Sequence, residues 1–363
     1  MGWRQGLILK PNIKELSLKE LEAELVQRGE PSYRAKQVWQ WLFQKRAVSF
    51  AEMTNLSAAL RARLAEGYTI GRLTLLREAV SKDGTRKFLF GLSDSHSIES
   101  VLIPEAKRLT LCVSTQVGCG FGCAFCATAV LGLKRNLRAS EILDQILEAS
   151  RSLAVDQRIT HVVLMGMGEP LANYAETVKA LNVMTDTGWG IGISPRRITL
   201  STVGLVPQIQ RLMEETKVNL AVSLHAATDE LRGKLMPVNR KYSLQQLMDC
   251  CRALPIPRRK RITFEYVLLG GINDSIEDAQ ALCQLLQGIR CKVNVIPFNP
   301  HPGSSYRRPN DAEVEKFQQY LQSQGLQINV RRPRGDDIQA ACGQLQGEET
   351  QGKQRLAVLA VAQ

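Results

Sequence analysis

The sequence predicts an α/β fold in which a partial parallel (β/α)6 barrel carries a small N-terminal helical domain and a β-hairpin extension. Three observations support this fold. From residue 109 onward, β-branched apolar runs alternate with amphipathic stretches of helical spacing. Before residue 70 the apolar spacing is helical, and between residues 73 and 104 it changes to a period of two. We therefore expect four segments, which are residues 1–70, 71–104, 105–332 and 333–363.

Composition and charge narrow the class of protein. The net charge is +12, from 47 Lys+Arg against 35 Asp+Glu. This surplus suits a polyanionic partner, although a solvated surface would give the same balance. Nine cysteines, no secretory leader over residues 1–16 and no apolar run long enough for a bilayer predict a cytoplasmic protein without a membrane partner. Gly6 stands where a myristoylation signal requires Ser or Thr.

The N-terminal segment should form three helices. The first begins at a capping box of Ser17 and Glu20 and ends at Gly29. The second and third are expected over residues 31–46 and 54–67. The second interleaves aromatic and basic side chains, which suits a nucleic-acid face, but aromatics at this spacing more often pack into a core.

A β-hairpin follows the helices. Residues 73–80 and 85–92 alternate apolar and polar side chains, and the Asp-Gly pair at residues 83–84 is a hairpin signal. A further run, residues 97–104, should continue the sheet and present Glu99 near the catalytic domain.

The barrel is expected from six strand–helix units in series. The polar loops after the strands should meet on one rim, where parallel barrels build their sites. The expected strands are residues 109–115, 159–165, 197–203, 218–225, 262–270 and 291–298, and the expected helices are residues 139–150, 174–184, 205–215, 243–254, 275–286 and 311–322.

The loop after the first barrel strand holds Cys119, Cys123 and Cys126 in the spacing C-x3-C-x2-C, with three glycines that let the backbone bend around the sulfurs. Three thiolates would hold three irons of a [4Fe-4S] cluster and leave the fourth iron open. A Cys3His zinc site and buried free cysteines are the alternatives. No further Cys or His occurs before His161, too far for a compact zinc site.

This loop resembles the signature of the radical S-adenosylmethionine (SAM) superfamily. Within that superfamily the chain resembles the RlmN/Cfr family of RNA methyltransferases, from the N-terminal helices to about Leu345. The resemblance is carried by IESVLIPE, LCVSTQVGCGFGCAFCATA, LMGMGEPLANY, ITLSTVG, VSLHA, IPFNP and GDDIQAACGQL.

The resemblance implies a [4Fe-4S] cluster bound by the three cysteines and SAM bound to the open iron. Read alone, Glu169 would be a turn residue and His225 a hydrogen-bonded structural histidine; their place on the rim favours ligand contacts. By the resemblance, the residues that contact SAM are Gly168, Glu169, Ser201, Ser223, Leu224, His225 and Asn299.

The resemblance also implies three catalytic residues. Cys342 takes a methyl group from one SAM, and a radical generated from a second SAM activates this methyl for addition to adenine. Cys112 then attacks the sulfur of Cys342, forming a disulfide and releasing the product. Glu99 matches the base that removes the ring proton, a role that Cys112 could share. Without the resemblance, each cysteine would be a small buried hydrophobic residue.

The implied substrate is C2 of one adenine in 23S rRNA, with the adenine beside the anticodon of some tRNAs as a second target. The helical domain and the basic clusters are the candidate RNA-binding surface. Methylation at C8, and a non-enzymatic RNA-binding protein with a structural metal, are the alternatives. We also expect a reducing partner such as flavodoxin or ferredoxin, and a monomer.

Overall fold

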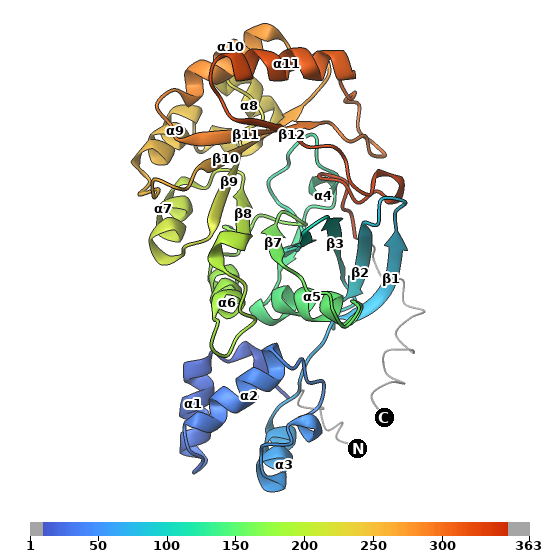
Figure 1. The fold of residues 1–363 in the computed structure, drawn as a ribbon, viewed down its shortest axis with the longest axis vertical. Coiled ribbons are helices and arrows are strands. Elements are labelled where there is room, and N and C mark those ends of the chain that lie inside the picture. Colours follow the sequence, from blue (N-terminus) through green and yellow to red (C-terminus); the bar gives the residue numbers. More distant parts are fainter. Residues whose placement is uncertain (1–9, 348–363) are drawn as a thin grey trace, which may run out of the picture.

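The computed structural model describes residues 10–347. Its centre is a ten-stranded sheet in the order β1-β2-β3-β4-β7-β8-β9-β10-β11-β12. The strands from β4 onward run parallel, whereas β1 to β4 are antiparallel, so the predicted α/β class with a partial barrel and a hairpin extension is confirmed. The helical domain lies at one end of the molecule, and α10 and α11 lie at the other (Figure 1).

The six expected barrel strands are present, and a short seventh strand, β12, joins the far edge. Sequence reasoning missed β12 because it has only three residues. The parallel strands are β4 (Arg108–Cys112), β7 (His161–Leu164), β8 (Ile198–Thr202), β9 (Asn219–Ser223), β10 (Ile262–Leu268), β11 (Cys291–Pro297) and β12 (Ile328–Val330).

The helices between these strands bury apolar stripes against the sheet. Of these helices, α5 buries the most side chains, and they include Ile142, Leu143, Ile146 and Leu147. In addition to the predicted helices, a short helix, α8, precedes α9. The helices are α5 (Ala139–Arg151), α6 (Tyr174–Thr185), α7 (Val206–Glu215), α8 (Asp229–Leu235), α9 (Leu244–Ala253), α10 (Ile276–Leu286) and α11 (Asp311–Ser323).

The antiparallel extension consists of β1 (Thr74–Val80), β2 (Arg86–Gly91) and β3 (Ser97–Glu105). Gly84 has a φ of 83° in the turn between β1 and β2, as the Asp-Gly signal predicts. Because β3 also pairs with β4, the sheet is continuous across residue 104. The division into four segments therefore remains a prediction.

The N-terminal helices are α1 (Leu18–Gln27), α2 (Tyr33–Phe43) and α3 (Ala58–Gly67), and the predicted capping box at the start of α1 is present. Some aromatic residues of α2 pack into the core, and others lie where a nucleic-acid face would require them. Trp39 and Phe43 are buried and pack edge to face at 4.8 Å. The Tyr33 ring, which is exposed, and the half-buried Trp41 ring carry cations on their faces, from Arg34 and Lys45 respectively.

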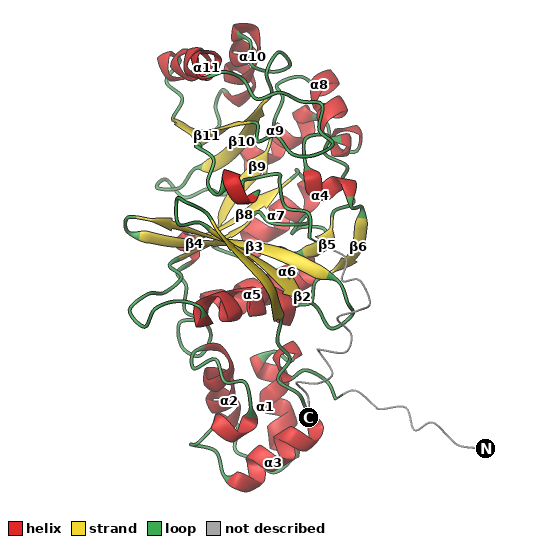
Figure 2. Cartoon of the chain, turned by 90° about the vertical axis from the view of Figure 1, so that its right-hand side faces the viewer, coloured by secondary structure: helices red, strands yellow, loops and turns green. Residues whose placement is uncertain are grey.

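A buried ion pair joins the helical domain to the barrel. Lys14, in the 3-10 helix η1 (Ile13–Glu15), binds the Asp144 carboxylate of α5. Each side chain is only 3% exposed, and α5 lies between the sheet and the N-terminal helices (Figure 2). Burial raises the pKa of Asp144 to about 6, and the charge of Lys14 opposes this rise. The charged form of the Asp144 carboxylate is therefore stabilised by the Lys14 cation beside it.

Among the described residues 10–347, none of the helices has the length and apolar character needed to cross a membrane. The sequence predictions that concern residues 1–9, including the absence of a leader, lie outside the described residues. The same holds for residues 348–363 of the expected C-terminal segment.

Lys14→Met should lower the free energy of unfolding by about 3 kcal/mol at pH 8, because it leaves a buried carboxylate without its partner. The raised pKa of Asp144 should rise further, so a larger fraction of the carboxyl is neutral at pH 5 and the loss should be smaller there. Urea unfolding at both pH values measures the difference. The double variant Lys14→Met/Asp144→Leu is the control and should recover most of the loss; an equal loss at both pH values would contradict the assignment.

Candidate active site

Two adjoining cavities open at the carboxyl ends of the parallel strands. The cluster cavity, about 160 Å³, is lined by Cys119, Cys123 and Cys126. The thiol cavity, about 470 Å³, is lined by Cys112 on one wall. Cys126 and Cys342 line both cavities. The rim predicted from the strand–loop pattern is therefore where the candidate residues gather.

The loop that carries the three cysteines is shaped by a small two-stranded sheet, β5 (Gln116–Gly118) with β6 (Leu133–Asn136). Gly118 has a φ of 73°, and a Cβ there would lie 1.8 Å from the Gly132 carbonyl oxygen, so no other residue fits. The Cys119 amide donates to the same carbonyl at 3.1 Å. Sequence reasoning missed this sheet because its strands are short.

The three thiols are buried and close enough to influence one another. Burial raises the pKa of Cys119 to about 11, and it also raises the pKa of Cys123, to which the charges of Cys126 and Cys119 add. Coordinated iron deprotonates such thiols outright. Within residues 10–347, no three His, Cys, Asp or Glu side chains converge on a point that could hold one metal ion. A [4Fe-4S] cluster does not need ligands that converge on one point, because each thiolate binds a different iron. Three soft donors beside a cavity therefore fit this cluster.

Gly168 and Glu169 follow β7 and line the cluster cavity. A Cβ on Gly168 would lie 2.5 Å from the Gln116 Cβ, and the φ of 98° also favours glycine. The Glu169 carboxylate accepts from the Leu171 amide at 3.0 Å and the Val203 amide at 2.8 Å. Burial raises the pKa of Glu169 to about 7. The carboxylate therefore holds two rim loops together beside the cavity.

Four of the other five predicted SAM contacts also line the cluster cavity: Ser201, Ser223, His225 and Asn299. Leu224 does not line it; its side chain is fully buried in the core.

His225 combines a structural contact with a place on the cavity wall. Its Nδ1 accepts from the Val267 amide at 2.9 Å, and its ring packs against Phe125 at 4.7 Å. Burial lowers the pKa of His225 to about 3, so the ring is neutral and its proton lies on Nε2. The hydrogen-bonded histidine expected from the sequence alone and a ligand-facing donor are thus compatible.

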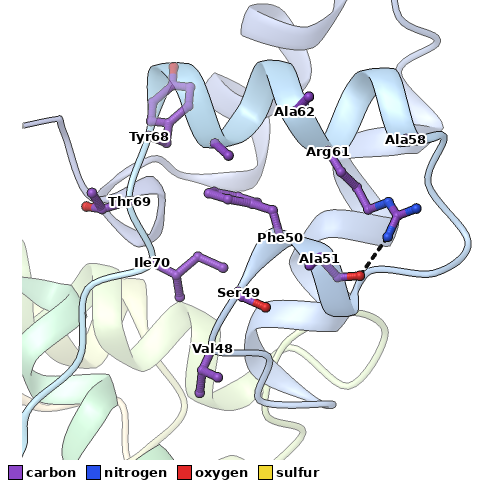
Figure 3. Close-up of a pocket in the computed structure, with 11 residues that line it drawn as sticks. Val48, Ser49, Phe50, Ala51, Ala58, Arg61, Ala62, Tyr68, Thr69 and Ile70 are labelled. Atoms are coloured by element: carbon purple, nitrogen blue, oxygen red, sulfur yellow. Dashed lines mark hydrogen bonds between the residues drawn. The ribbon is translucent and has the colours of Figure 1, made fainter. Parts of the chain in front are cut away.

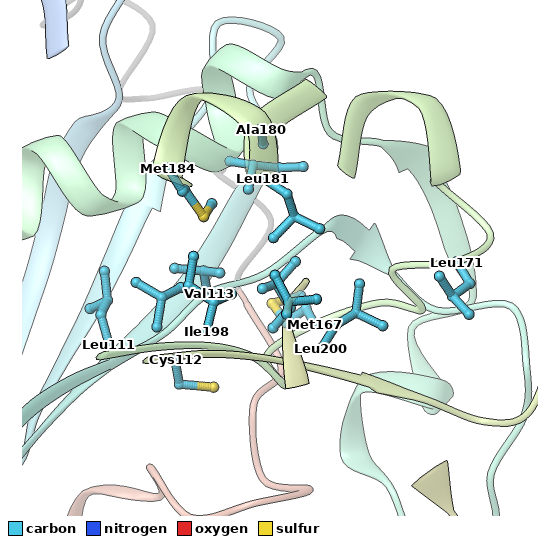
Figure 4. Packing of buried hydrophobic residues seen from close by; sticks show 14 of the residues in the cluster. Leu111, Cys112, Val113, Met167, Leu171, Ala180, Leu181, Met184, Ile198 and Leu200 are labelled. Carbon is cyan, nitrogen blue, oxygen red and sulfur yellow. The ribbon is translucent and has the colours of Figure 1, made fainter. Parts of the chain in front are cut away.

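Cys112 ends β4 and faces the barrel interior, opposite to Leu111 and Val113, which point into the core beneath α6 (Figure 4). Burial raises its pKa to about 12, and the charge of Cys342 adds to this effect. The Sγ of Cys342 lies 3.9 Å from Nη1 of Arg331. All nine cysteines are free thiols.

Hydrogen bonds join the segment around Cys342 to the residues that follow Cys126. The Ala127 amide donates to the Gly343 carbonyl at 2.8 Å, and the Thr128 hydroxyl donates to the Leu345 carbonyl at 2.5 Å. These bonds hold an exposed thiol between the two cavities.

Glu99 lies on β3 but outside both cavities. Its carboxylate pairs with Lys87 at 3.0 Å and accepts from the amides of Gln346 at 2.8 Å and Gly347 at 3.3 Å. The Glu99 carboxylate is thus held by Lys87 and by the amides of residues 346–347. Its predicted role as a base stays a prediction.

Sequence reasoning missed three charged residues of this region. Glu265 and Arg331 line the cluster cavity, and Arg232 lies behind it. The basic cluster at residues 331–334 was a signal for Arg331. Nothing in the sequence marked Arg232 or Glu265, because both act through packing between segments that are distant in the chain.

A third cavity, about 560 Å³, lies in the helical domain and is walled by apolar side chains such as Phe50, Tyr68 and Ile70 (Figure 3). It shares no residue with the two rim cavities.

The sequence model described as the radical SAM superfamily matches residues 113–285, which contain the cysteine loop and most of the barrel. A second model, described as the ribosomal RNA large subunit methyltransferase N-terminal domain, matches residues 11–70. The fold and the site thus define a radical SAM protein, with a [4Fe-4S] cluster and SAM as its cofactors.

The curated relatives identify the family. The chain is 52% identical over 336 residues to the dual-specificity RNA methyltransferase RlmN of Syntrophobacter fumaroxidans, covering 93% of this chain and 98% of that protein. It is 50% identical over 337 residues to the RlmN of Geobacter sulfurreducens, covering 93% and 92%. A crystal structure of a radical SAM methyltransferase from Sphaerobacter thermophilus is 44% identical, with a TM-score of 0.88 and coverage of 92% and 99%. The chain belongs to the RlmN family of radical SAM RNA methyltransferases. It is therefore an enzyme, and the alternative of a non-enzymatic RNA-binding protein is excluded.

Gly168→Ala should weaken SAM binding by roughly tenfold, because the new Cβ would overlap Gln116 and displace the rim loop. The matched control is Gly233→Ala in α8, where a Cβ meets no atom within 4 Å. That variant should bind SAM normally and be equally or more stable. Equilibrium binding of SAM to the cluster-loaded proteins measures both; normal affinity in Gly168→Ala would show that this loop does not shape the SAM site.

Proposed function

We propose that this protein methylates C2 of a specific adenine in 23S rRNA, and the adenine 3′ of the anticodon in some tRNAs, with Cys342 as the methyl carrier and two SAM consumed per turnover. The observation that carries the proposal is the position of Cys342, which lines both rim cavities, whereas Cys112 lines only one. One thiol can thus face the cofactor and the other can face the substrate side.

Cys342 is suited to accept a methyl group. The thiolate is the nucleophile in such transfers, and Nη1 of Arg331 lies 3.9 Å from the Cys342 sulfur. The Cys342 sulfur would form a bond to the methyl carbon while the bond from that carbon to the sulfonium sulfur of SAM breaks, which would leave S-adenosylhomocysteine and a neutral methylated cysteine. When bound, the cluster and SAM supply the methyl group and the radical that activates it.

The activated methyl then links Cys342 to the adenine ring, and Cys112 resolves this link. The Cys112 sulfur attacks the Cys342 sulfur, so a disulfide forms and the bond between Cys342 and the carbon breaks. The released electron pair passes to the carbon, which takes up a proton to become the methyl group. Because its pKa lies near 12, Cys112 must lose its proton during this step.

Two groups are candidates for the base that removes the adenine ring proton. Glu99 would first have to give up its bonds to the amides of residues 346–347. Cys112 already lines the cavity. We propose that Glu99 can act as the base only after the C-terminal segment has moved and released its carboxylate, whereas Cys112 needs no such movement.

The thiol cavity is proposed to receive the adenine. Its volume of about 470 Å³ falls in the usual range for small-ligand sites. A base must leave its stack to reach it, which favours a loop or single strand. Arg332 and Arg334 line the same cavity and would meet phosphates. In the helical domain, the Tyr33–Arg34 and Trp41–Lys45 pairs are the proposed RNA contacts.

The remaining features of the proposal concern the cellular context. We propose that the enzyme works in the cytoplasm as a monomer and that a flavodoxin or ferredoxin supplies its electrons.

Cys112→Ala should stop the reaction after the adenine has been linked to Cys342, because no thiol is left to break the link. RNA crosslinked to protein should accumulate and should appear as a shifted band on a denaturing gel. Cys112→Ala/Cys342→Ala should give no crosslink. Cys283→Ala, on α10 outside both cavities, is the matched control and should turn over normally. Normal turnover by Cys112→Ala would disprove the resolving role.

The wild-type product should be 2-methyladenosine. Methylation of 23S rRNA fragments with the reduced enzyme, followed by digestion and chromatography against both methyladenosine isomers, identifies it. If 8-methyladenosine is the product, the C8 alternative is correct and the C2 assignment is wrong.

A further inference from the structure

Arg232, in α8, is the largest side chain that the structure buries completely, with no exposed surface. Burying a guanidinium is costly unless its donors are satisfied. Here every acceptor is neutral: Nε donates to the Leu224 carbonyl at 3.1 Å, Nη1 to the Asn239 amide oxygen at 2.8 Å, and Nη2 to the carbonyls of Val203 at 2.8 Å and Ser223 at 3.0 Å.

Two of these acceptors lie on the rim that surrounds the cluster cavity. Val203 and Ser223 line the cavity and follow or end β8 and β9. Gly204, next to Val203, has a φ of 106°, which favours glycine, and a Cβ there would lie 3.2 Å from a methyl carbon of Leu247. The guanidinium thus fixes the spacing between the ends of two neighbouring strands.

The same helix also holds the cysteine loop. The Ala124 amide, between Cys123 and Cys126, donates to the Leu235 carbonyl at the end of α8 at 2.9 Å. Arg232 therefore links the two rim strands to the segment on which the cluster ligands sit.

The charge of Arg232 has no direct anionic partner. Among the described residues, no carboxylate forms an ion pair with it. Asp229 is reached only through Asn239, which donates to it at 2.7 Å. Burial lowers the pKa of Arg232 to about 10, so it remains charged at neutral pH, and Cys123 is the first of the groups whose charge raises that pKa. The sulfur of Cys123 is a proposed ligand of the cluster.

We infer that Arg232 is a positioning residue for the SAM-binding rim and the buried counter-charge of the iron–sulfur cluster. This inference rests on the proposed placement of the cluster at Cys119, Cys123 and Cys126. A cluster with three thiolate ligands is anionic and gains a further negative charge on reduction. A cation fixed beside it stabilises the reduced form and raises its midpoint reduction potential.

Two substitutions separate the charge of Arg232 from its shape. Arg232→Lys keeps the cation but cannot reach all four acceptors, so SAM affinity should fall about tenfold while the potential stays close to that of the wild type. Arg232→Gln removes the charge as well, so the potential should become more negative in addition. Redox titration followed by electron paramagnetic resonance and equilibrium SAM binding measure the two effects.

Asn239→Asp combined with Asp229→Asn provides a second route to the same charge change and keeps the Arg232 side chain. The amide introduced at position 229 can donate to the carboxylate introduced at position 239, in place of the present bond at 2.7 Å. A carboxylate next to Nη1 neutralises the cation and should also make the potential more negative. Arg86→Gln is the matched control, because Arg86 is half-buried and lines neither rim cavity. It should change neither the potential nor SAM affinity.

In the cluster-free protein, Arg232→Lys should speed hydrogen exchange over residues 201–205 and 222–226, because the hydrogen bonds from Arg232 to these two segments are lost. If Arg232→Gln and the double variant Asn239→Asp/Asp229→Asn leave the potential unchanged, the counter-charge role is wrong. If Arg232→Lys binds SAM as tightly as the wild type, the positioning role is wrong. Loss of the cluster in Cys126→Ala tests the proposed cluster placement separately, because it does not depend on Arg232.

Discussion

The burial of three thiols on one short loop is the constraint on which the rest of the site depends. Without metal, desolvation keeps Cys119, Cys123 and Cys126 protonated. Thiolate ligands therefore exist there only with a positive partner in place. The surrounding backbone must hold the sulfurs in position before the metal arrives, and it does so through the β5–β6 sheet, the close approach at Gly118 and the bond from Ala124 to α8.

The regular elements could be predicted because their signals are local. The hairpin at Gly84, the capping box before α1 and the alternation of strands and helices each arise from a few neighbouring residues. The short strands β5, β6 and β12 could not be predicted in the same way. Three or four residues carry too little periodicity, and their pairing is decided by the loop geometry and the sheet edge next to them.

The site was predictable to the extent that the family motifs and the strand–loop pattern mark it. From these signals Glu169, Ser201 and His225 were expected at one site, and all three line the cluster cavity. They did not determine where an individual side chain points: Leu224 packs into the core, and Glu99 turns toward the C-terminal segment. They also gave no sign of Arg232, because its role depends on four acceptors that three separate segments supply only after folding.

The C-terminal segment connects these observations to the chemistry. In its proposed role as methyl carrier, Cys342 must be held but must also be able to move between two sites. The Cys342 segment meets both needs because a few hydrogen bonds hold it, through Gly343, Leu345 and the Glu99 carboxylate, and it contains no helix or strand from residue 339 to 347. Cys112, by contrast, is fixed in β4. One thiol on a segment that can shift and one on a rigid strand suit a carrier and a resolving residue, respectively. The Glu99 carboxylate binds the amides of residues 346–347 of the same segment, so in the proposed mechanism a shift of this segment would also release Glu99.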